Sequence, residues 1–583
     1  MRISRFAGIF LICSVSYCYG QAQKSAAAPT AETLYQRGLA ALQQKDLTSA
    51  EGDFRKAIRI SPGHADAHNA LGWIELSQRK IPEAITEFRT AIKLQPGHTR
   101  AHLNLSSALT QSGKLEEALV EARAAVKFAP KDSEAHRSLG RILSFRKDLE
   151  GAIAELSKAV ELDPKKAEVH DELGAVFAQA SRHDDAAREF LQAVKLQPDF
   201  AKAQLHLGVV LLQQKSLDSA TEHLKAGMRV DPANPLAHFY LAQALTEQGK
   251  TDEAVAELQT CVKLQPSNAE AYTRLGLLLQ RLGEGDGTVA AFRKCVALQP
   301  ENPDAHNNLG LALIQAGDAA GAIPQFETAL RLKPADSGYR GNLGTAYLQK
   351  ADFNAAVEHF QAALKDAPDD ATLHYDLGLA LKLKDQLPEA KAEFLKAAEL
   401  NPSQADIQYT LGVTLWQQGQ FAEAVDHLHA ATQAKPDYAE AYYTLGTVLN
   451  QQGQSKEAAV ALREAIRLQP DFAGAHTTLA AVLRKLGDTE GASAEGRLGT
   501  QIAKEQTGQQ AANFSTNSGK RLLTAGDLEG AISQFRSAIN SMPNFAQAHY
   551  QLGVALARKG EKAEAAKEFQ QAAALDPKLQ PPQ

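Results

Sequence analysis

A proline recurs every 34 residues through most of this 583-residue chain. It stands at Pro62 and Pro96, continues in the same register to Pro470, and the period resumes at Pro543 and Pro577. A strict period of this length is typical of chains built from stacked supersecondary units, in which each unit contacts only its neighbours. The period therefore predicts a solenoid and argues against a single globular core.

Each period predicts two helices. In residues 439–472 the apolar and small residues of the first half follow the i, i+3, i+4, i+7 spacing of an amphipathic helix, at Tyr442, Leu445, Gly446 and Leu449. Gly453 interrupts this pattern, a second helical pattern follows, and Pro470 ends it. One repeat is therefore expected to be helix, turn, helix, turn.

Small residues and leucine recur at constant positions of the repeat. With Ala31 as position 1, the repeats begin at residues 31, 65, 99, 133, 167, 201, 235, 269, 303, 337, 371, 405, 439, 473, 512 and 546. Position 7 is leucine in 14 of these 16 repeats, position 8 is glycine in 13 and position 20 is alanine in 15. This pattern closely resembles the tetratricopeptide repeat family over residues 31 to 579. The resemblance implies an all-α, right-handed superhelical solenoid of about 16 helix pairs, whose first helices line a concave groove.

The pattern divides the chain into segments. We predict a signal peptide at 1–22, a lead-in linker at 23–30, a main repeat array at 31–487, a C-terminal repeat pair at 512–579 and a tail at 580–583. Residues 488–511 have lost the second half of a repeat, and Lys504 replaces the expected proline. This glutamine-rich stretch is either a loose or extended helix that acts as a hinge, or a merely degenerate repeat.

The first 22 residues have the layout of a secretory signal peptide. Arg2 and Arg5 precede a short apolar stretch from Ala7 to Gly20, too short to span a bilayer comfortably, and small residues follow it. We expect cleaved export to the periplasm or the medium. An uncleaved anchor, or a lipoprotein that uses Cys18, are the alternatives.

Charge and composition exclude some functions. The formal net charge is −6 and no basic face stands out, so nucleic acid is not an expected partner. Cys261 and Cys295 occupy the same position of adjacent repeats. Equivalent residues on packed helices lie roughly 8–10 Å apart, beyond the reach of a disulfide, so we interpret both as buried small side chains.

Neither catalysis nor metal binding is expected. The repeats occupy nearly the whole chain, which leaves no room for a catalytic domain, and no cofactor is implied. Nine of the 17 histidines occupy position 4, one per repeat. Two imidazoles that share a zinc ion need nitrogens about 3.3 Å apart, closer than equivalent sites on neighbouring repeats, so we interpret this column as packing.

The candidate binding residues lie at positions 5, 9 and 12 of three successive first helices: Tyr375, Leu379, Tyr409, Val413, Trp416 and Tyr443. We expect them to form an exposed aromatic cluster, a common kind of binding hot spot. Leu205 and Phe239 form a second, weaker cluster.

These observations predict a non-catalytic scaffold that binds a protein or peptide segment in its groove. Because exported arrays of this kind resemble parts of such machines, envelope assembly, secretion or polysaccharide export are the expected settings, with possible peripheral envelope association. The alternative is a carbohydrate-binding module that uses the groove aromatics to stack on sugar rings.

Overall fold

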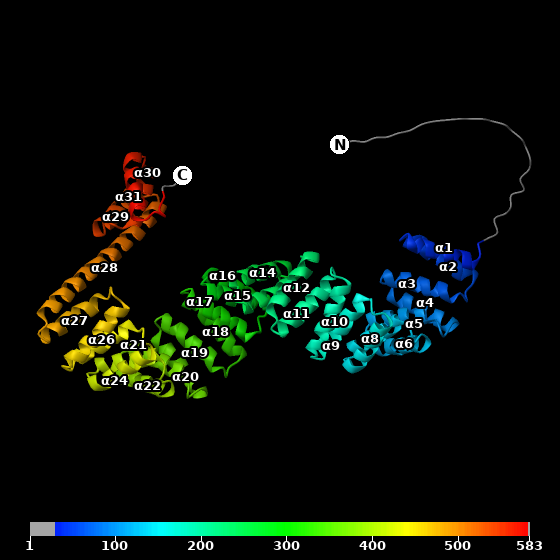
Figure 1. The fold of residues 1–583 in the computed structure, drawn as a ribbon, viewed down its shortest axis with the longest axis horizontal. Helices are drawn as coiled ribbons and strands as arrows, with labels where there is room; N and C mark the ends of the chain where they lie inside the picture. The colour runs from blue at the N-terminus through cyan, green and yellow to red at the C-terminus, as the bar shows by residue number, and fades with distance from the viewer. Residues whose placement is uncertain (1–28, 581–583) are drawn as a thin grey trace, which may run out of the picture. The chain divides into compact units, whose positions relative to one another are not determined.

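The computed structural model describes residues 29–580, which are all-α: they form 31 helices and no strand (Figure 1). The chain divides into two compact units, Met1–Leu279 and Gln280–Gln583. Both units are built from antiparallel helix pairs, so the prediction of an all-α array of helix pairs is confirmed. The predicted signal peptide and most of the lead-in linker lie outside the described residues.

The helices of the first unit, with α15 reaching across its end, are α1 (Ala31–Gln43), α2 (Leu47–Ile60), α3 (Ala65–Ser77), α4 (Ile81–Leu94), α5 (Thr99–Gln111), α6 (Leu115–Phe128), α7 (Ser133–Phe145), α8 (Leu149–Leu162), α9 (Ala167–Gln179), α10 (His183–Leu196), α11 (Ala201–Gln213), α12 (Leu217–Val230), α13 (Pro235–Glu247), α14 (Thr251–Leu264) and α15 (Ala269–Leu282).

The helices of the second unit are α16 (Gly285–Leu298), α17 (Pro303–Gln315), α18 (Ala319–Leu332), α19 (Ser337–Gln349), α20 (Phe353–Asp366), α21 (Ala371–Leu383), α22 (Leu387–Leu400), α23 (Ala405–Gln417), α24 (Phe421–Ala434), α25 (Ala439–Gln451), α26 (Ser455–Leu468), α27 (Ala473–Lys485), α28 (Thr489–Thr524), α29 (Leu528–Ser541), α30 (Ala546–Lys559) and α31 (Lys562–Leu575).

The turn inside each repeat depends on one left-handed residue at position 15. Glycine fills this position with a positive φ at Gly113, Gly249, Gly283, Gly317, Gly419, Gly453, Gly487, Gly526 and Gly560. Other residues adopt the same conformation at Lys45, Arg79, Lys147, Ser181, Lys215, Ala351 and Asp385. Because L-residues avoid this region, the structure tolerates seven locally strained turns to keep every helix pair in the same geometry.

The two helices of a repeat approach closely because position 8 lacks a side chain. A Cβ added to Gly378 would lie 2.5 Å from Cε1 of Phe394, the fully buried residue at position 24 of the same repeat. The same contact occurs at Gly38–Phe54, Gly72–Phe88, Gly174–Phe190, Gly310–Phe326, Gly344–Phe360, Gly519–Phe535 and, with leucine, at Gly140–Leu156, Gly208–Leu224, Gly412–Leu428 and Gly446–Leu462. Position 8 therefore receives the large residue of the second helix.

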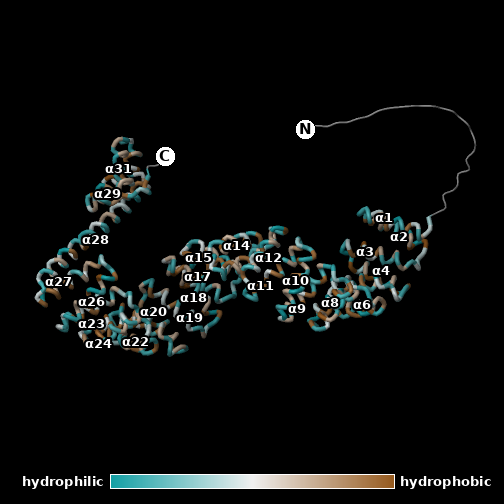
Figure 2. Tube along the Cα trace, viewed as in Figure 1, coloured by the Kyte–Doolittle hydropathy of each residue, from teal (hydrophilic) through white to brown (hydrophobic). Residues whose placement is uncertain are grey.

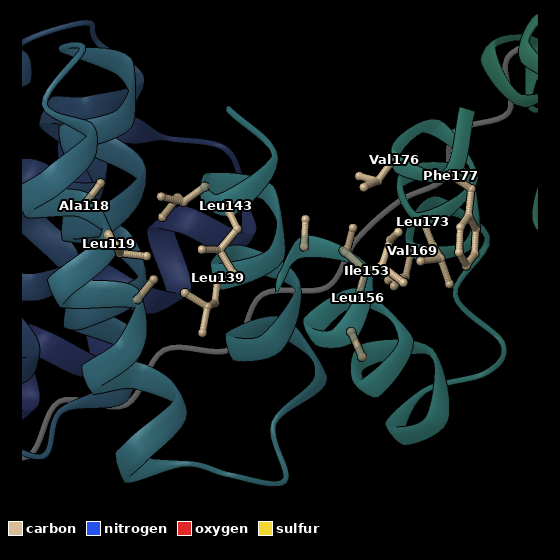
Figure 3. Close-up of a cluster of buried hydrophobic side chains, with 14 of the residues drawn as sticks. Ala118, Leu119, Leu139, Leu143, Ile153, Leu156, Val169, Leu173, Val176 and Phe177 are labelled. Carbon is tan, nitrogen blue, oxygen red and sulfur yellow. The ribbon is translucent and has the colours of Figure 1, made fainter. Parts of the chain in front are cut away.

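Apolar side chains between consecutive helices form the core. Along individual helices, hydrophobic and hydrophilic residues alternate (Figure 2). In the first unit, side chains of α6 to α9 form part of one buried cluster, which includes Leu119, Leu139, Leu156 and Leu173 (Figure 3). Each helix thus buries one row of apolar side chains. A single helix pair could not bury all of its apolar side chains without the neighbouring repeats.

Helix α28 interrupts the regular array. Its 36 residues are continuous, and they join the second helix of the fourteenth repeat to the first helix of the fifteenth. The side chain of Gln506 donates a hydrogen bond to the backbone oxygen of Asp471, 2.8 Å away. Of the interpretations offered by the sequence for 488–511, the structure has the extended helix; whether it is a hinge stays a prediction.

Position 7 carries a polar residue in two repeats. In regular repeats its leucine packs on the preceding repeat, as Leu71 of α3 does in one cluster with Phe54 of α2. The two exceptions are Arg37 and Ser518. Arg37 lies on α1, the first helix described, and donates two hydrogen bonds to the carboxylate of Asp53 on α2. Ser518 lies in the last part of α28, which continues from the preceding repeat without a turn.

Candidate partner-binding surface

The six predicted binding residues lie on first helices of consecutive repeats. Tyr375 and Leu379 belong to α21, Tyr443 belongs to α25, and the remaining three residues belong to α23. All six are half-buried and none is fully exposed. We call the surface that these residues form the first-helix face of α21, α23 and α25. Its side chains are less exposed than the sequence analysis predicts.

Contacts with neighbouring aromatic rings and hydroxyls account for this burial. The ring of Tyr375 lies 5.8 Å from that of Phe394, and its hydroxyl lies 3.3 Å from the Thr410 hydroxyl of the next first helix. The ring of Tyr409 lies 5.0 Å from that of Tyr438. Each tyrosine thus contributes to packing as well as to the surface.

The third tyrosine repeats this arrangement. The ring of Tyr443 lies 4.7 Å from that of Phe472, in the turn before α27. Its hydroxyl lies beside Gly474, where an added Cβ would be 3.3 Å from it. The hydroxyls of Tyr409 and Tyr443 make no hydrogen bond within residues 29–580, so they have donors to offer a partner.

Trp416 connects the predicted aromatic cluster to the glutamines near the ends of the first helices. Its indole Nε1 donates a hydrogen bond to Oε1 of Gln451, 2.7 Å away on α25. One edge of the indole is therefore held by the neighbouring repeat, while its ring stays half-buried. A partner would meet a preorganised tryptophan rather than a mobile one.

Residues 35 apart connect neighbouring first helices along both units. In each of these contacts, position 5 of one repeat meets position 6 of the next. Members of this ladder are Asn69 with Asn104, Arg137 with Glu172, Asp171 with His206, Phe239 with Arg274, Asn307 with Asn342 and Tyr375 with Thr410. Position 5 therefore has a structural role in many repeats, which the periodicity alone did not indicate.

Helix α21 carries two further charged groups, Asp376 and Lys382. Asp376 is half-buried, and burial together with the nearby Asp370 raises its pKa to about 6. Burial lowers the pKa of Lys382, which is also half-buried. Neither side chain forms an ion pair within the described residues 29–580. Both charges thus lack compensation in this part of the chain.

The structure also shows surface features that the sequence analysis missed. Trp73 and Phe145, on α3 and α7, are 45% and 54% exposed. Their signal in the sequence is an aromatic residue at position 9 or 13 of a first helix. By contrast, Leu205 and Phe239, the weaker predicted cluster, are both buried, so that prediction of an exposed contact site is wrong.

An apolar hollow of about 330 Å³ lies between α9, α11 and α13 of the first unit. Its lining includes Ala175 and Ala178, which are small residues at positions 9 and 12 of the same helix, and the exposed Leu236. The hollow exists because α9 places alanine where most first helices carry larger residues.

The histidine column is part of the scaffold, as predicted. Nε2 of His170 donates to the carbonyl oxygen of Pro164 at 3.1 Å, and Nδ1 lies 2.7 Å from Oε2 of Glu189. The same pair of contacts joins His68, His102, His136, His238, His374, His476 and His549 to a proline carbonyl and a glutamate. In each of these residues one ring nitrogen thus faces a carbonyl oxygen and the other a carboxylate.

The hydrogen bonds shift the pKa of two of these histidines. The Glu189 carboxylate raises the pKa of His170 against the effect of burial. Burial opposes the shift at His102, but hydrogen bonds to Glu121 and the Pro96 carbonyl outweigh it and raise the pKa of His102.

Cys261 and Cys295 are both buried, and Cys261 is a free thiol, so their interpretation as buried small side chains is confirmed. Between residues 29 and 580, no group of three or more His, Cys, Asp or Glu side chains is placed to hold a metal ion. None of the helices described is both long and apolar enough to cross a bilayer.

Paired helices of 13 or 14 residues over most of the chain, glycine at most of the close crossings and a proline after nearly every second helix define a helical-repeat protein. The chain belongs to the tetratricopeptide repeat family. Models of that repeat match residues 273–337, 409–471, 443–499 and 516–579, and further models match 313–374 and 371–404. Residues 24–274 match the model of the C-terminal domain of cilia and flagella-associated protein 70.

Several solved structures are similar to parts of the chain. PilF of Pseudomonas aeruginosa is 22% identical, with 35% of this chain and 93% of that chain covered, at a TM-score of 0.33. YrrB, described as a tetratricopeptide repeat protein with an unusual peptide-binding site, is 20% identical over 32% and 96%, at 0.29. Yeast Tom70 is 16% identical over 72% and 96%, at 0.32. No curated protein sequence matches the chain.

Tetratricopeptide repeat proteins generally act as non-catalytic scaffolds for protein–protein interactions. A protein or peptide is therefore the expected kind of partner for this chain as well.

Proposed function

We propose that the first-helix face of α21, α23 and α25 binds a segment of a partner protein through Tyr375, Leu379, Tyr409, Val413, Trp416 and Tyr443. The observation that carries this proposal is a row of three half-buried tyrosine rings on the first helices of successive repeats, two of which have hydroxyls without a hydrogen-bond partner in residues 29–580. Aromatic side chains with a held ring and an available polar end are typical anchors of protein interfaces.

A protein segment fits this surface better than a sugar does. Each tyrosine ring already lies within 4.7 to 5.8 Å of another aromatic ring, which reduces the ring surface left for stacking on a sugar. The unpaired charges of Asp376 and Lys382 also suit a partner that carries charged side chains. The carbohydrate-binding alternative has no comparable support.

We also propose that the mature protein works outside the cytoplasm, in envelope assembly, secretion or polysaccharide export. The support is the charge and apolar pattern of residues 1–22. N-terminal sequencing of the protein recovered from periplasmic and medium fractions tests the export step. An intact Met1 in a cytoplasmic fraction would contradict it.

Quantitative capture from envelope extract tests the binding surface. The wild-type chain is compared with the Tyr375→Ala, Tyr409→Ala, Tyr443→Ala triple variant. Tyr442→Ala is the matched control, because Tyr442 lies on α25 at position 4, beside the proposed surface. We expect a partner that the triple variant loses and the control retains.

Far-UV circular dichroism of each variant separates lost binding from lost folding. The Tyr409→Phe, Tyr443→Phe variant keeps both rings and removes only the two hydroxyls, so it measures their share of the affinity. Equal capture by the wild type and the folded triple variant would refute the proposed surface.

A further inference from the structure

Charged residues at position 6 of the first helices normally have a partner. Glu172 receives two hydrogen bonds of 2.8 Å from the guanidinium of Arg137, at position 5 of the preceding repeat. His206 lies 2.7 Å from the carboxylate of Asp171, again at position 5. Arg274 lies over the ring of Phe239, also at position 5. The ladder thus gives each of these side chains a partner at position 5 of the preceding repeat.

Asp376 breaks this rule. It occupies position 6 of α21, but position 5 of the preceding repeat is Gly341, which has no side chain to offer. The room beside Gly341 is filled by Leu373, since an added Cβ would meet its Cδ2 at 2.7 Å. Asp376 therefore has neither a hydrogen bond nor an ion pair within residues 29–580.

An unpaired, half-buried carboxylate is unfavourable, and the raised pKa of Asp376 reflects that cost. A carboxylate in such a position is a candidate for recognition of an external charge. Its location supports this role, because Asp376 follows Tyr375 in the chain and lies on the helix that carries two of the proposed binding residues.

The chain itself shows which group an acidic ladder residue takes. Glu172 binds a guanidinium in a two-pronged contact, and Asp171 binds the ammonium of Lys202 at 3.0 Å as well as His206. A basic side chain from a partner that reaches the Asp376 carboxylate would supply the contact that the ladder lacks at this residue. Paired hydrogen bonds to a carboxylate also give geometric selectivity.

We propose that Asp376 is a specificity-determining residue that binds a lysine or arginine side chain of the partner segment held by the first-helix face of α21, α23 and α25. This inference rests on the proposed function, and it adds the chemistry of the partner: an apolar or aromatic segment with a basic residue at one defined position.

Selection from a library of displayed 12-residue random peptides against the full chain tests the proposal. We expect the bound peptides to carry arginine or lysine at one aligned position. A synthetic peptide of the selected sequence is then compared with one in which norleucine replaces that basic residue. Replacement is expected to weaken binding about 10- to 100-fold, which corresponds to about 1.5–3 kcal/mol for a hydrogen bond to a charged group.

Variants of the protein, measured with both peptides, complete a double-mutant cycle. Asp376→Asn keeps the shape of the side chain. We expect it to weaken the binding of the basic peptide by the same factor and to leave the binding of the norleucine peptide unchanged. Asp366→Asn is the matched control, because Asp366 is an exposed acid at the end of the second helix α20. Asp376→Lys is expected to select glutamate or aspartate at the position where the wild type selects a base.

The outcomes separate this inference from the proposed function. If peptides bind and need the three tyrosines, but show no basic preference or bind Asp376→Asn equally well, the role of Asp376 is refuted and the binding surface stands. If the wild type binds no peptide, or if binding survives the triple tyrosine variant, both proposals fall.

Discussion

Replacing Gly378 with alanine tests how closely the helices of a repeat must approach. The added Cβ would lie 2.5 to 3.0 Å from three ring atoms of Phe394, and this ring is fully buried and cannot swing into solvent. Overpacking of this kind costs about 1–3 kcal/mol, whereas alanine gains about 1 kcal/mol over glycine from helix propensity. We expect a net loss of up to about 2 kcal/mol in the local stability of α21 and α22.

The sign of this effect should reverse when the ring is absent. In a Phe394→Ala background the added methyl group meets no ring, so Gly378→Ala should stabilise the pair by about 1 kcal/mol. The chain contains natural precedents, because the three repeats without glycine at position 8 have a residue other than phenylalanine at position 24, as in Ala242 with Leu258. The coupling between the two substitutions measures the contact directly.

Hydrogen exchange followed by mass spectrometry is the suitable assay, since a long repeat array does not unfold in one cooperative step. Peptides from α21 and α22 report the local opening free energy in the wild type, both single variants and the double variant. A Gly378→Ala effect of the same sign and size in both backgrounds would refute the reasoning.

Three further outcomes are expected. Gly453→Ala should destabilise α25 and α26 by about 1 kcal/mol through backbone strain alone, because φ is +81° and an added Cβ meets nothing within 4 Å; unchanged hydrogen exchange there would contradict this. The raised pKa of His170 stabilises α9 and α10 fully below its unfolded value of about 6.5, and this contribution should be lost as pH rises through the folded pKa. Glu189→Gln should flatten that pH dependence, measured by hydrogen exchange corrected for its intrinsic rate, while α5 and α6 keep theirs. Limited proteolysis should cut first within residues 503–507 of α28, which are all exposed, and separate the C-terminal repeat pair; first cuts elsewhere would argue against a hinge there.

Most of the local structure could be predicted from the sequence because each repeat presents the same signals again. Pro470 follows the end of α26, and Gly453 adopts the left-handed conformation between α25 and α26, as the pattern indicated. Pro235 and Pro303 open first helices, where a missing N–H costs little. Sixteen copies of one pattern give the prediction more support than any single helix could.

The candidate site was less predictable. The spacing placed Tyr375, Tyr409 and Tyr443 on first helices, but their exposure depends on residues of neighbouring elements, such as Phe394 and Phe472. The ladder contacts, which Asp376 lacks, join residues that are 35 apart in the chain. The sequence indicates such contacts only when residues at that separation are compared for complementary side chains.

The sequence by itself determined the repeat, its helix boundaries and the close crossing at position 8, because these depend on interactions within 34 residues that recur in register. Only the tertiary structure decided which side chains have partners. Whether a charged side chain has a partner depends on the residue that the preceding repeat places opposite it: Arg137 pairs with Glu172, whereas Gly341 has no side chain to pair with Asp376. The tertiary structure also decided that residues 489–511 continue as one helix, since the choice between a turn and a continuous helix depends on the contacts of both neighbouring repeats.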